Sequence, residues 1–448
     1  MTVLSETDAH QIARRALDFA GEADEAEVVV SSADTGLTRF ANNGIHQNVS
    51  EDSVHVNLRL ALGKRVGVAD GNQVDSDSLR GLAERAASIA RLQPENPDFA
   101  GLPSGGERRT AGGLCQSTLE FSPEDRADGA AKVVNAAQAR GLTAFGAFST
   151  GVRSVAVAST AGIEQYHQGT TANANAVLMN DDASGTAMAL SSDVTEIDME
   201  SIGEAAADKA ERGVSPEDIE PGTYEVVLEE AAVAQMVEFL AFESFNGLFH
   251  EEGRSFTSAS MGKAVMGENI SIWDDGVDPT GIASPFDGEG VARERVDFIE
   301  NGVLKAVVYD HQTASKYGAE NTGHAWTAPN PYGPVAANLF MAPGEAASVD
   351  DLVAGVERGV WVTTFHYTNL LEPMRVVLTG MTRHGTFMIE NGKVTKPLRN
   401  LRFTQSVLDA FSAVEALTRD TKLTGDYLRV RAPAMLIREF QFTGGSQS

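Results

Sequence analysis

The stretch from Met236 to Phe256 comes closer than any other part of the chain to a catalytic metal site. Its apolar residues keep helical spacing without a proline, which predicts a helix over about 230–245 that ends near Gly247. A helix can hold zinc when two histidines lie about one turn apart, with a glutamate beside the first. Only His250 is present here, and the next histidine along the chain is His311. This spacing favours a structural or surface role for His250.

The nine histidines (10, 46, 55, 167, 250, 311, 324, 366 and 384) include no pair at the spacing of helical metal ligands. His311 follows Asp310, whose carboxylate could orient the imidazole as a general base. Three others are expected in loops or beside strands, where functional residues are common. A divergent site built from several histidines and an acidic neighbour such as Asp310 therefore stays open, although a structural role for each is the simpler interpretation. Its candidate ligands are His250, His324, His366 and His384.

Motifs for nucleophilic catalysis and phosphate binding are absent from the sequence. Gly-x-Ser-x-Gly does not occur, and neither do the two glycine-rich patterns that cradle phosphates. The single Cys115 excludes an intrachain disulfide, and without a histidine nearby it is expected to be a free bystander thiol. The residues alone therefore do not declare an independent active site.

The charge of the chain limits its partners. The formal net charge is −28, and the 35 basic residues include only 9 lysines. A strongly acidic surface argues against nucleic acid or an anionic membrane as a partner, and it fits a protein adapted to a high-salt cytoplasm. No apolar run reaches about 18 residues and no signal pattern opens the chain, so we expect a soluble, cytoplasmic protein.

The first half reads as an α+β domain, predicted to cover 1–220. Helices are expected at 5–20 and 75–91 around strands at 26–30, 38–41, 54–62 and 66–69. A linker rich in proline and glycine follows at about 92–118. The order then begins again, with helices at 122–140 and 199–212 around strands at 142–149, 153–159 and 172–179. Gly162-Ile163-Glu164-Gln165 also echoes Gly44-Ile45-His46-Gln47, which indicates an internal duplication.

The second half, 221–448, is predicted to be rich in β-structure after its opening helix. Ile-Glu-Asn-Gly occurs twice, and in each copy Asn-Gly (301–302 and 391–392) separates alternating apolar runs. Asn-Gly in that position is a strong hairpin signal, because both residues tolerate positive φ. We expect large antiparallel sheets, arranged as a sandwich or an open barrel, with one further helix at 348–359.

Several motifs, in their order along the chain, together resemble the TldD/PmbA (TldE) family. They are Arg39-Phe40-Ala41-Asn42-Asn43-Gly44-Ile45, Asp287-Gly288-Glu289-Gly290, Thr322-Gly323-His324-Ala325, Leu378-Thr379-Gly380-Met381-Thr382-Arg383 and Ile389-Glu390-Asn391-Gly392-Lys393. The resemblance implies a cytosolic peptidase made of two related subunits, which degrades unfolded peptides and trims precursor peptides. In that family the TldD-type subunit binds zinc through a His-Glu-x-x-x-His helix and a C-terminal cysteine.

This sequence departs from the family pattern at the metal site. In register with the zinc motif, Phe242 and Gly247 take the places of the two histidines, and only Glu243 remains. The region 424–442 contains no cysteine. The resemblance therefore implies a noncatalytic TldE/PmbA-type subunit without its own cofactor, whose TldD-type partner holds the zinc and with which it encloses a chamber for peptides. An independently active metallopeptidase with a divergent histidine site and a peptide-binding protein without catalysis remain the alternatives, so the enzyme status stays open.

Overall fold

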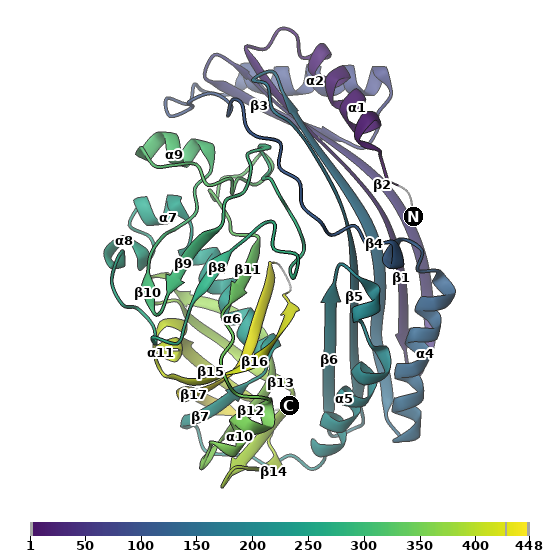
Figure 1. Ribbon diagram of the computed structural model, residues 1–448, viewed down its shortest axis with the longest axis vertical. Helices are drawn as coiled ribbons and strands as arrows, with labels where there is room; N and C mark the ends of the chain where they lie inside the picture. The colour runs from purple at the N-terminus through teal and green to yellow at the C-terminus, as the bar shows by residue number, and fades with distance from the viewer. Residues whose placement is uncertain (1–2, 426–427, 446–448) are drawn as a thin grey trace.

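The computed structural model describes residues 3–425 and 428–445, and two sheets dominate it (Figure 1). The sheet of the first half is long and curved, and the second half of the chain lies against its inner face. The protein is therefore mixed α+β with large sheets, as predicted. Among the described residues, no helix is both long and apolar enough to cross a membrane.

The first sheet has six antiparallel strands in the order β3-β2-β1-β4-β5-β6. Strands predicted as separate pieces are continuous: 26–30 and 38–41 belong to one strand, and so do 142–149 and 153–159. Those two strands pair with each other at the centre of the sheet, so hydrogen bonds on both sides hold even their weak β-formers extended. The strands are β1 (Glu25–Ala41), β2 (Gly44–Leu62), β3 (Arg65–Gly71), β4 (Thr143–Ser159), β5 (Glu164–Met179) and β6 (Ser184–Ser191).

Four helices pack on the outer face of this sheet, and the first residue before each accepts a hydrogen bond from the first turn through its side chain. Ser5, Asp75, Ser122 and Asp198 cap them, and Ser122 forms a capping box with Asp125. In Figure 1, α1 and α2 lie at the upper end of the sheet, and α4 and α5 at the lower end. The helices are α1 (Glu6–Phe19), α2 (Ser76–Leu92), α4 (Pro123–Ala139) and α5 (Met199–Arg212).

The internal duplication predicted within the first half of the chain has a structural counterpart. Each of the two repeats contributes a helix, three strands and a second helix. Gly67 on β3 lies so close to α2 that a Cβ there would clash with the Ala86 carbonyl and stand 2.6 Å from the Ala90 nitrogen. Gly185 on β6 has the matching place against α5, where a Cβ would clash with the Ala206 carbonyl and stand 2.6 Å from the Ala210 nitrogen. The same strand-on-helix contact thus occurs twice.

The segment between the two repeats, predicted as a linker over 92–118, forms no strand. It holds one short helix, α3 (Gln116–Leu119), and otherwise follows the sheet. Its Gly113 carbonyl accepts a hydrogen bond from the Thr170 nitrogen at 2.8 Å. The segment is therefore fastened to β5.

The second sheet has eleven strands and contains a closed ring, β7-β17-β15-β13-β12, in which β7 pairs with both β12 and β17. Most pairs are antiparallel, as predicted, but β7–β12 and β11–β17 are parallel. Parallel neighbours need long crossovers, which local hairpin signals do not reveal. The strands are β7 (Gly222–Leu228), β8 (Ile272–Asp274), β9 (Val296–Glu300), β10 (Val303–Leu304), β11 (Asn338–Met341), β12 (Arg358–Glu372), β13 (Val377–Glu390), β14 (Lys393–Pro397), β15 (Leu401–Ser406), β16 (Val414–Thr424) and β17 (Arg429–Gly445).

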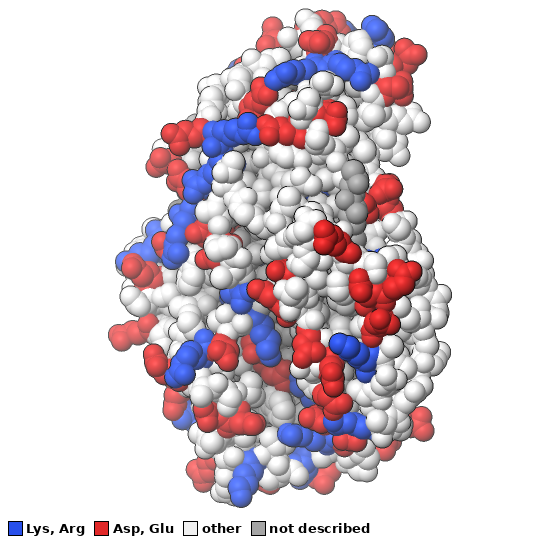
Figure 2. Space-filling view, turned by 45° about the vertical axis from the view of Figure 1, so that its right-hand side comes forward, with Lys and Arg blue, Asp and Glu red and all other residues white. Residues whose placement is uncertain are grey.

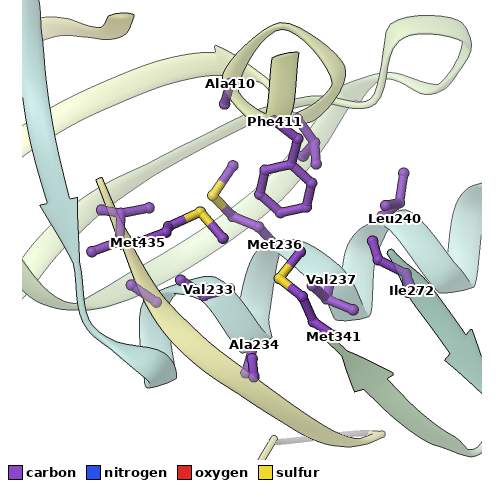
Figure 3. Packing of buried hydrophobic residues seen from close by; sticks show 14 of the residues in the cluster. Val233, Ala234, Met236, Val237, Leu240, Ile272, Met341, Ala410, Phe411 and Met435 are labelled. Carbon is purple, nitrogen blue, oxygen red and sulfur yellow. The ribbon is translucent and has the colours of Figure 1, made fainter. Parts of the chain in front are cut away.

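Helix α6 (Glu230–Ser244) lies in the core of the second half, and most of its side chains are buried. Figure 3 shows Met236, Val237 and Leu240 pointing into a cluster with residues of β8, β11, β17 and a short helix. The other helical elements are short: α7 (Gly247–Glu251), α8 (Thr257–Ser260), α9 (His311–Tyr317), α10 (Val349–Ala354), α11 (Val407–Ser412), and the 3₁₀ turns Val194–Glu196 and Pro373–Arg375. The helix predicted at 348–359 is α10, which ends before Gly355.

Candidate functional site

The stretch set in register with a zinc motif is divided between two helices. Helix α6 ends at Ser244, and α7 begins at Gly247 after Asn246, whose side chain accepts a hydrogen bond from the Phe249 nitrogen. Phe242 and Glu243 therefore lie on one helix, and Gly247 on the next. The regular one-turn spacing of a helical zinc motif is lost at this break.

Gly247 has no room for a side chain. Its nitrogen donates a hydrogen bond to the Val308 carbonyl at 2.9 Å. A Cβ at this position would stand 2.6 Å from the Val308 oxygen and 2.7 Å from the Tyr309 ring. These contacts require glycine, so the second ligand position of the motif is closed by the backbone of the segment before α9.

Phe242 packs edge to face against Trp326, with ring centroids 6.1 Å apart. Glu243 is half-buried, and burial raises the pKa of its carboxyl although Arg254 opposes this. Of the three motif positions, only Glu243 offers a metal donor, because an aromatic carbon ring and a glycine have no lone pair to give. These residues do not fit a zinc ion.

The four candidate histidines have different partners. His250, on α7, places Nδ1 3.2 Å from the Thr257 hydroxyl. His366 lies half-buried on β12, and burial, followed by Arg383, lowers its pKa. His384, on β13, places Nδ1 2.9 Å from the Ser184 hydroxyl of β6. Among the described residues, no group of three or more His, Cys, Asp or Glu is arranged to hold a metal ion.

His324 is fully buried and links three segments of the second half. Its Nε2 lies 3.1 Å from Asp274 Oδ1, and its Nδ1 lies 2.9 Å from the Thr322 hydroxyl. Burial lowers the pKa of His324 more than the Asp274 carboxylate raises it. The other oxygen of Asp274 accepts the backbone N–H groups of Ala337 and Asn338. With all these partners satisfied, the pair holds β8, β11 and the 322–327 loop together.

Asp310, the carboxylate predicted to orient His311, accepts a hydrogen bond from the Thr313 nitrogen at 2.7 Å and caps α9. His311 Nε2 is buried and finds no hydrogen-bond partner among the described residues. The free thiol of Cys115 is half-buried, with Sγ 3.8 Å from the Ser192 hydroxyl.

An ion cluster at the contact between the two halves was not predicted from the sequence. Arg59 of β2 donates to Glu27 of β1 at 2.9 Å and to Glu289 of the second half at 2.8 Å. Burial and the charges of Glu289 and Asp287 raise the pKa of Glu27 to about 7, although Arg59 opposes them. The signal available in the sequence is Asp287-Gly288-Glu289-Gly290, which places two acidic residues in a short glycine-containing segment.

A cavity of about 860 Å³ lies between the inner face of the first sheet and the second half. Val28 and Val30 face the helices, whereas Val29 and Val157 face Phe286 of the second half. The lining includes valines of β1 and β4, the 282–288 loop and the 325–327 segment. Trp326 belongs to this lining, so the end of α6 and the cavity share a wall.

The surface carries the acidic charge expected from composition, with 63 acidic and 35 basic residues. Figure 2 shows acidic side chains from the top to the bottom of this face, with basic side chains among them and a group of acidic ones to the right of its centre. This contrasts with the cavity, whose charged lining residues are mostly arginines.

Comparison with known proteins matches successive parts of the chain to PmbA/TldA metallopeptidase models. Domain 1 matches residues 26–90, the central domain 118–214 and the C-terminal domain 221–444. A metalloprotease of Methanothermobacter thermautotrophicus is 23% identical over 228 residues, which cover 50% of this chain and 49% of that protein. The metalloprotease PmbA of Escherichia coli O157:H7 is 24% identical over 193 residues, with 42% and 39% covered. The matches thus span less than half the length of these curated relatives.

A solved structure has the same fold over nearly the whole chain. TldE from Thermococcus kodakarensis gives a TM-score of 0.88 at 18% identity, with 98% of this chain and 100% of that chain covered. At this identity the likeness shows the fold.

Proposed function

The chain belongs to the PmbA/TldD family of metallopeptidases, and from this premise we propose that it is a noncatalytic TldE/PmbA-type subunit. It pairs with a TldD-type subunit that carries the zinc ion. Together the two chains degrade or trim unfolded peptides, and this chain forms part of the chamber around the partner's active site.

The observation that carries this proposal is the close packing at Gly247. The Val308 carbonyl and the Tyr309 ring occupy the space that a ligand side chain would need. Phe242 is likewise committed to an apolar contact with Trp326. Without a metal-bound water, Glu243 has nothing to activate as a general base. The zinc chemistry of the family then has to come from another chain.

The setting follows from the same proposal. An obligate pair of this kind needs a large interface, on the order of 2,000 Å² or more of buried surface. The acidic surface supports a protein of a high-salt cytoplasm that binds neither nucleic acid nor membrane. Exposed sheet edges near a chamber could bind peptide backbone by strand addition.

The test compares the purified chain alone, the TldD-type partner alone and the two together, in high salt. Zinc content and cleavage of an unfolded peptide are measured for each. The proposal expects no zinc and no cleavage from this chain, and cleavage when both chains are present. Gly247→Ala in this chain provides a further comparison, because a disturbed α7 should lower complex activity without creating activity in the isolated chain.

Two alternatives predict different results. An independently active enzyme would bring stoichiometric zinc and cleavage to the isolated chain, and His250, His324, His366 and His384 would be the first residues to replace. A peptide-binding protein without catalysis would bind peptide alone and leave the activity of the partner unchanged. Either result would overturn the subunit proposal.

A further inference from the structure

The cavity between the two halves contains a buried arginine, Arg293, whose charge interacts with the carboxylates of Asp274 and Asp287 but whose hydrogen-bonding capacity is not fully used. Arg293 lines the cavity and is 6% exposed. Its Nε and Nη1 atoms find no hydrogen-bond partner among the described residues. Burying guanidinium N–H groups without hydrogen-bond acceptors is costly, so the Nε and Nη1 positions of Arg293 favour a ligand that offers acceptor atoms.

The charged groups around Arg293 make the cavity basic. Arg153 of β4 and Arg429 of β17 also line it. The carboxylate in the lining belongs to Asp287, which accepts the backbone N–H groups of Glu289, Val291 and Ala325. Burial, followed by the charge of Glu289, raises the pKa of Asp287 to about 7, and the charge of Arg293 opposes this shift. Three arginines and one carboxylate thus line this cavity, although the chain as a whole has a net charge of −28.

The rest of the lining is suited to an organic molecule. Valines of the first sheet and Phe286 form apolar walls, and Trp326 adds an aromatic face. His167 contributes Nε2, which is buried without a partner. A volume of about 860 Å³ lies within the range of pockets for ligands of several hundred daltons. Guanidinium groups match the planar geometry of carboxylates.

We propose that this cavity binds the carboxyl-terminal end of a short apolar peptide, with Arg293 receiving the carboxylate. The arginines of the cavity indicate that the ligand carries a carboxylate. The valines and Phe286 in the lining indicate that the rest of the ligand is apolar. The choice of a peptide rests on the proposed function, in which this chain works on peptides. Arg293 acts here as a binding residue, and no chemical step takes place in the cavity.

The test is calorimetric titration of the isolated chain with acetyl-Ala-Leu-Ala as the free acid, the same peptide as its amide, and inorganic phosphate. We expect the acid to bind at least tenfold more tightly than the amide. Equal binding of acid and amide would overturn the proposal, and so would no binding of either. Phosphate binding as tightly as the acid would also overturn it, since the site would then recognise a small oxyanion and not a peptide.

Variants of the chain locate the binding. Arg293→Gln should abolish the preference for the acid. Arg153→Gln should weaken acid binding severalfold. Because Arg153 is exposed on the sheet, this second variant tests the site independently of whether Arg293→Gln folds. Arg295→Gln is the matched control, because Arg295 is exposed, pairs with Asp297 and does not line the cavity. Unchanged acid binding in Arg153→Gln and a folded Arg293→Gln would contradict the proposal.

The experiment separates this inference from the proposed function. Titration uses the isolated chain, whereas the proposed function is tested by cleavage in the presence of the partner. A chain that supports cleavage but binds acid and amide alike would retain the function and lose the inference. A chain that prefers the acid but leaves the partner inactive would support the inference about the cavity and contradict the proposed function.

Discussion

The rings of Phe242 and Trp326 meet edge to face at 83°, with centroids 6.1 Å apart. This contact joins the last turn of α6 to the wall of the cavity between the two halves. In the register that the family resemblance gives, an imidazole would be needed where this phenyl ring lies. The end of α6 therefore makes an apolar contact at this position.

Restoring both histidines should not restore a zinc site. Gly247→His forces a side chain against the Val308 carbonyl, and overpacking of this kind costs about 1–3 kcal/mol or more. We expect Phe242→His/Gly247→His to unfold more easily than the wild type and to copurify without stoichiometric zinc. Elemental analysis and thermal unfolding check this, with Phe242→Leu as the control that keeps an apolar contact. One zinc per chain at wild-type stability would show that the packing argument is wrong.

The duplicated glycines should be equally intolerant of a methyl group. Gly67→Ala and Gly185→Ala each drive a Cβ into the backbone of the adjacent helix, so each should lower the free energy of unfolding by about 2 kcal/mol or more. Gly112→Ala is the control, because nothing lies within 4 Å of a Cβ at that position. Urea unfolding measures all three. Similar stabilities for Gly67→Ala and Gly112→Ala would contradict the close approach of β3 to α2.

Removing Arg59 should weaken the contact between the two halves in a pH-dependent way. Arg59→Met leaves Glu27 and Glu289 buried without their partner, which costs about 3–5 kcal/mol when both are charged. The pKa of Glu27 is already raised to about 7, so its protonated form is favoured in the folded state below that pH and this advantage is lost as pH rises through 7. The deficit of the variant should accordingly be larger at pH 8 than at pH 5.5.

Chemical denaturation at the two pH values measures this deficit. Arg91→Met is the control, because the Arg91–Glu22 pair is exposed and such pairs contribute about 1 kcal/mol or less. A deficit that is the same at both pH values would mean that the carboxylates gain solvent or another partner when Arg59 is removed.

His384 should make the fold sensitive to acid. Burial, then the charges of Arg383 and His366, lower its pKa to about 4. The folded state resists protonation of this ring. The contribution of His384 to the free energy of unfolding is therefore complete above the ordinary histidine pKa of about 6.5, and it is lost as pH decreases toward 4. The loss amounts to about 3 kcal/mol by pH 4, on the basis of about 1.4 kcal/mol for each pKa unit.

His384→Gln should flatten the stability profile between pH 6.5 and 4, because glutamine does not titrate. The comparison is made by urea unfolding at a series of pH values, and acidic groups common to both proteins cancel in the difference. His55→Gln is the control at an exposed histidine. Parallel profiles for the wild type and His384→Gln would show that the ring is accessible to protons in the folded state.

The sequence by itself determined the local elements and the residue types in the stretch set in register with the zinc motif. The residue patterns that predicted helices over 122–140, 199–212 and 230–245 are short-range signals, and the structure contains all three helices. The repeated order of helices and strands predicted the duplication for the same reason. The substitutions Phe242 and Gly247 were also visible, because the loss of a donor atom is a property of residue type.

Tertiary structure alone decided how distant segments meet. The ring closed by β7 and the parallel β11–β17 pair join residues far apart in sequence, and no local pattern encodes such pairings. From the sequence, Arg59 is an ordinary strand residue. Only the fold shows that it pairs with Glu289 across the contact between the two halves. Arg293 reads as a surface charge until the fold buries it beside the first sheet. Burial changes the energy of these charges, and burial depends on the whole chain.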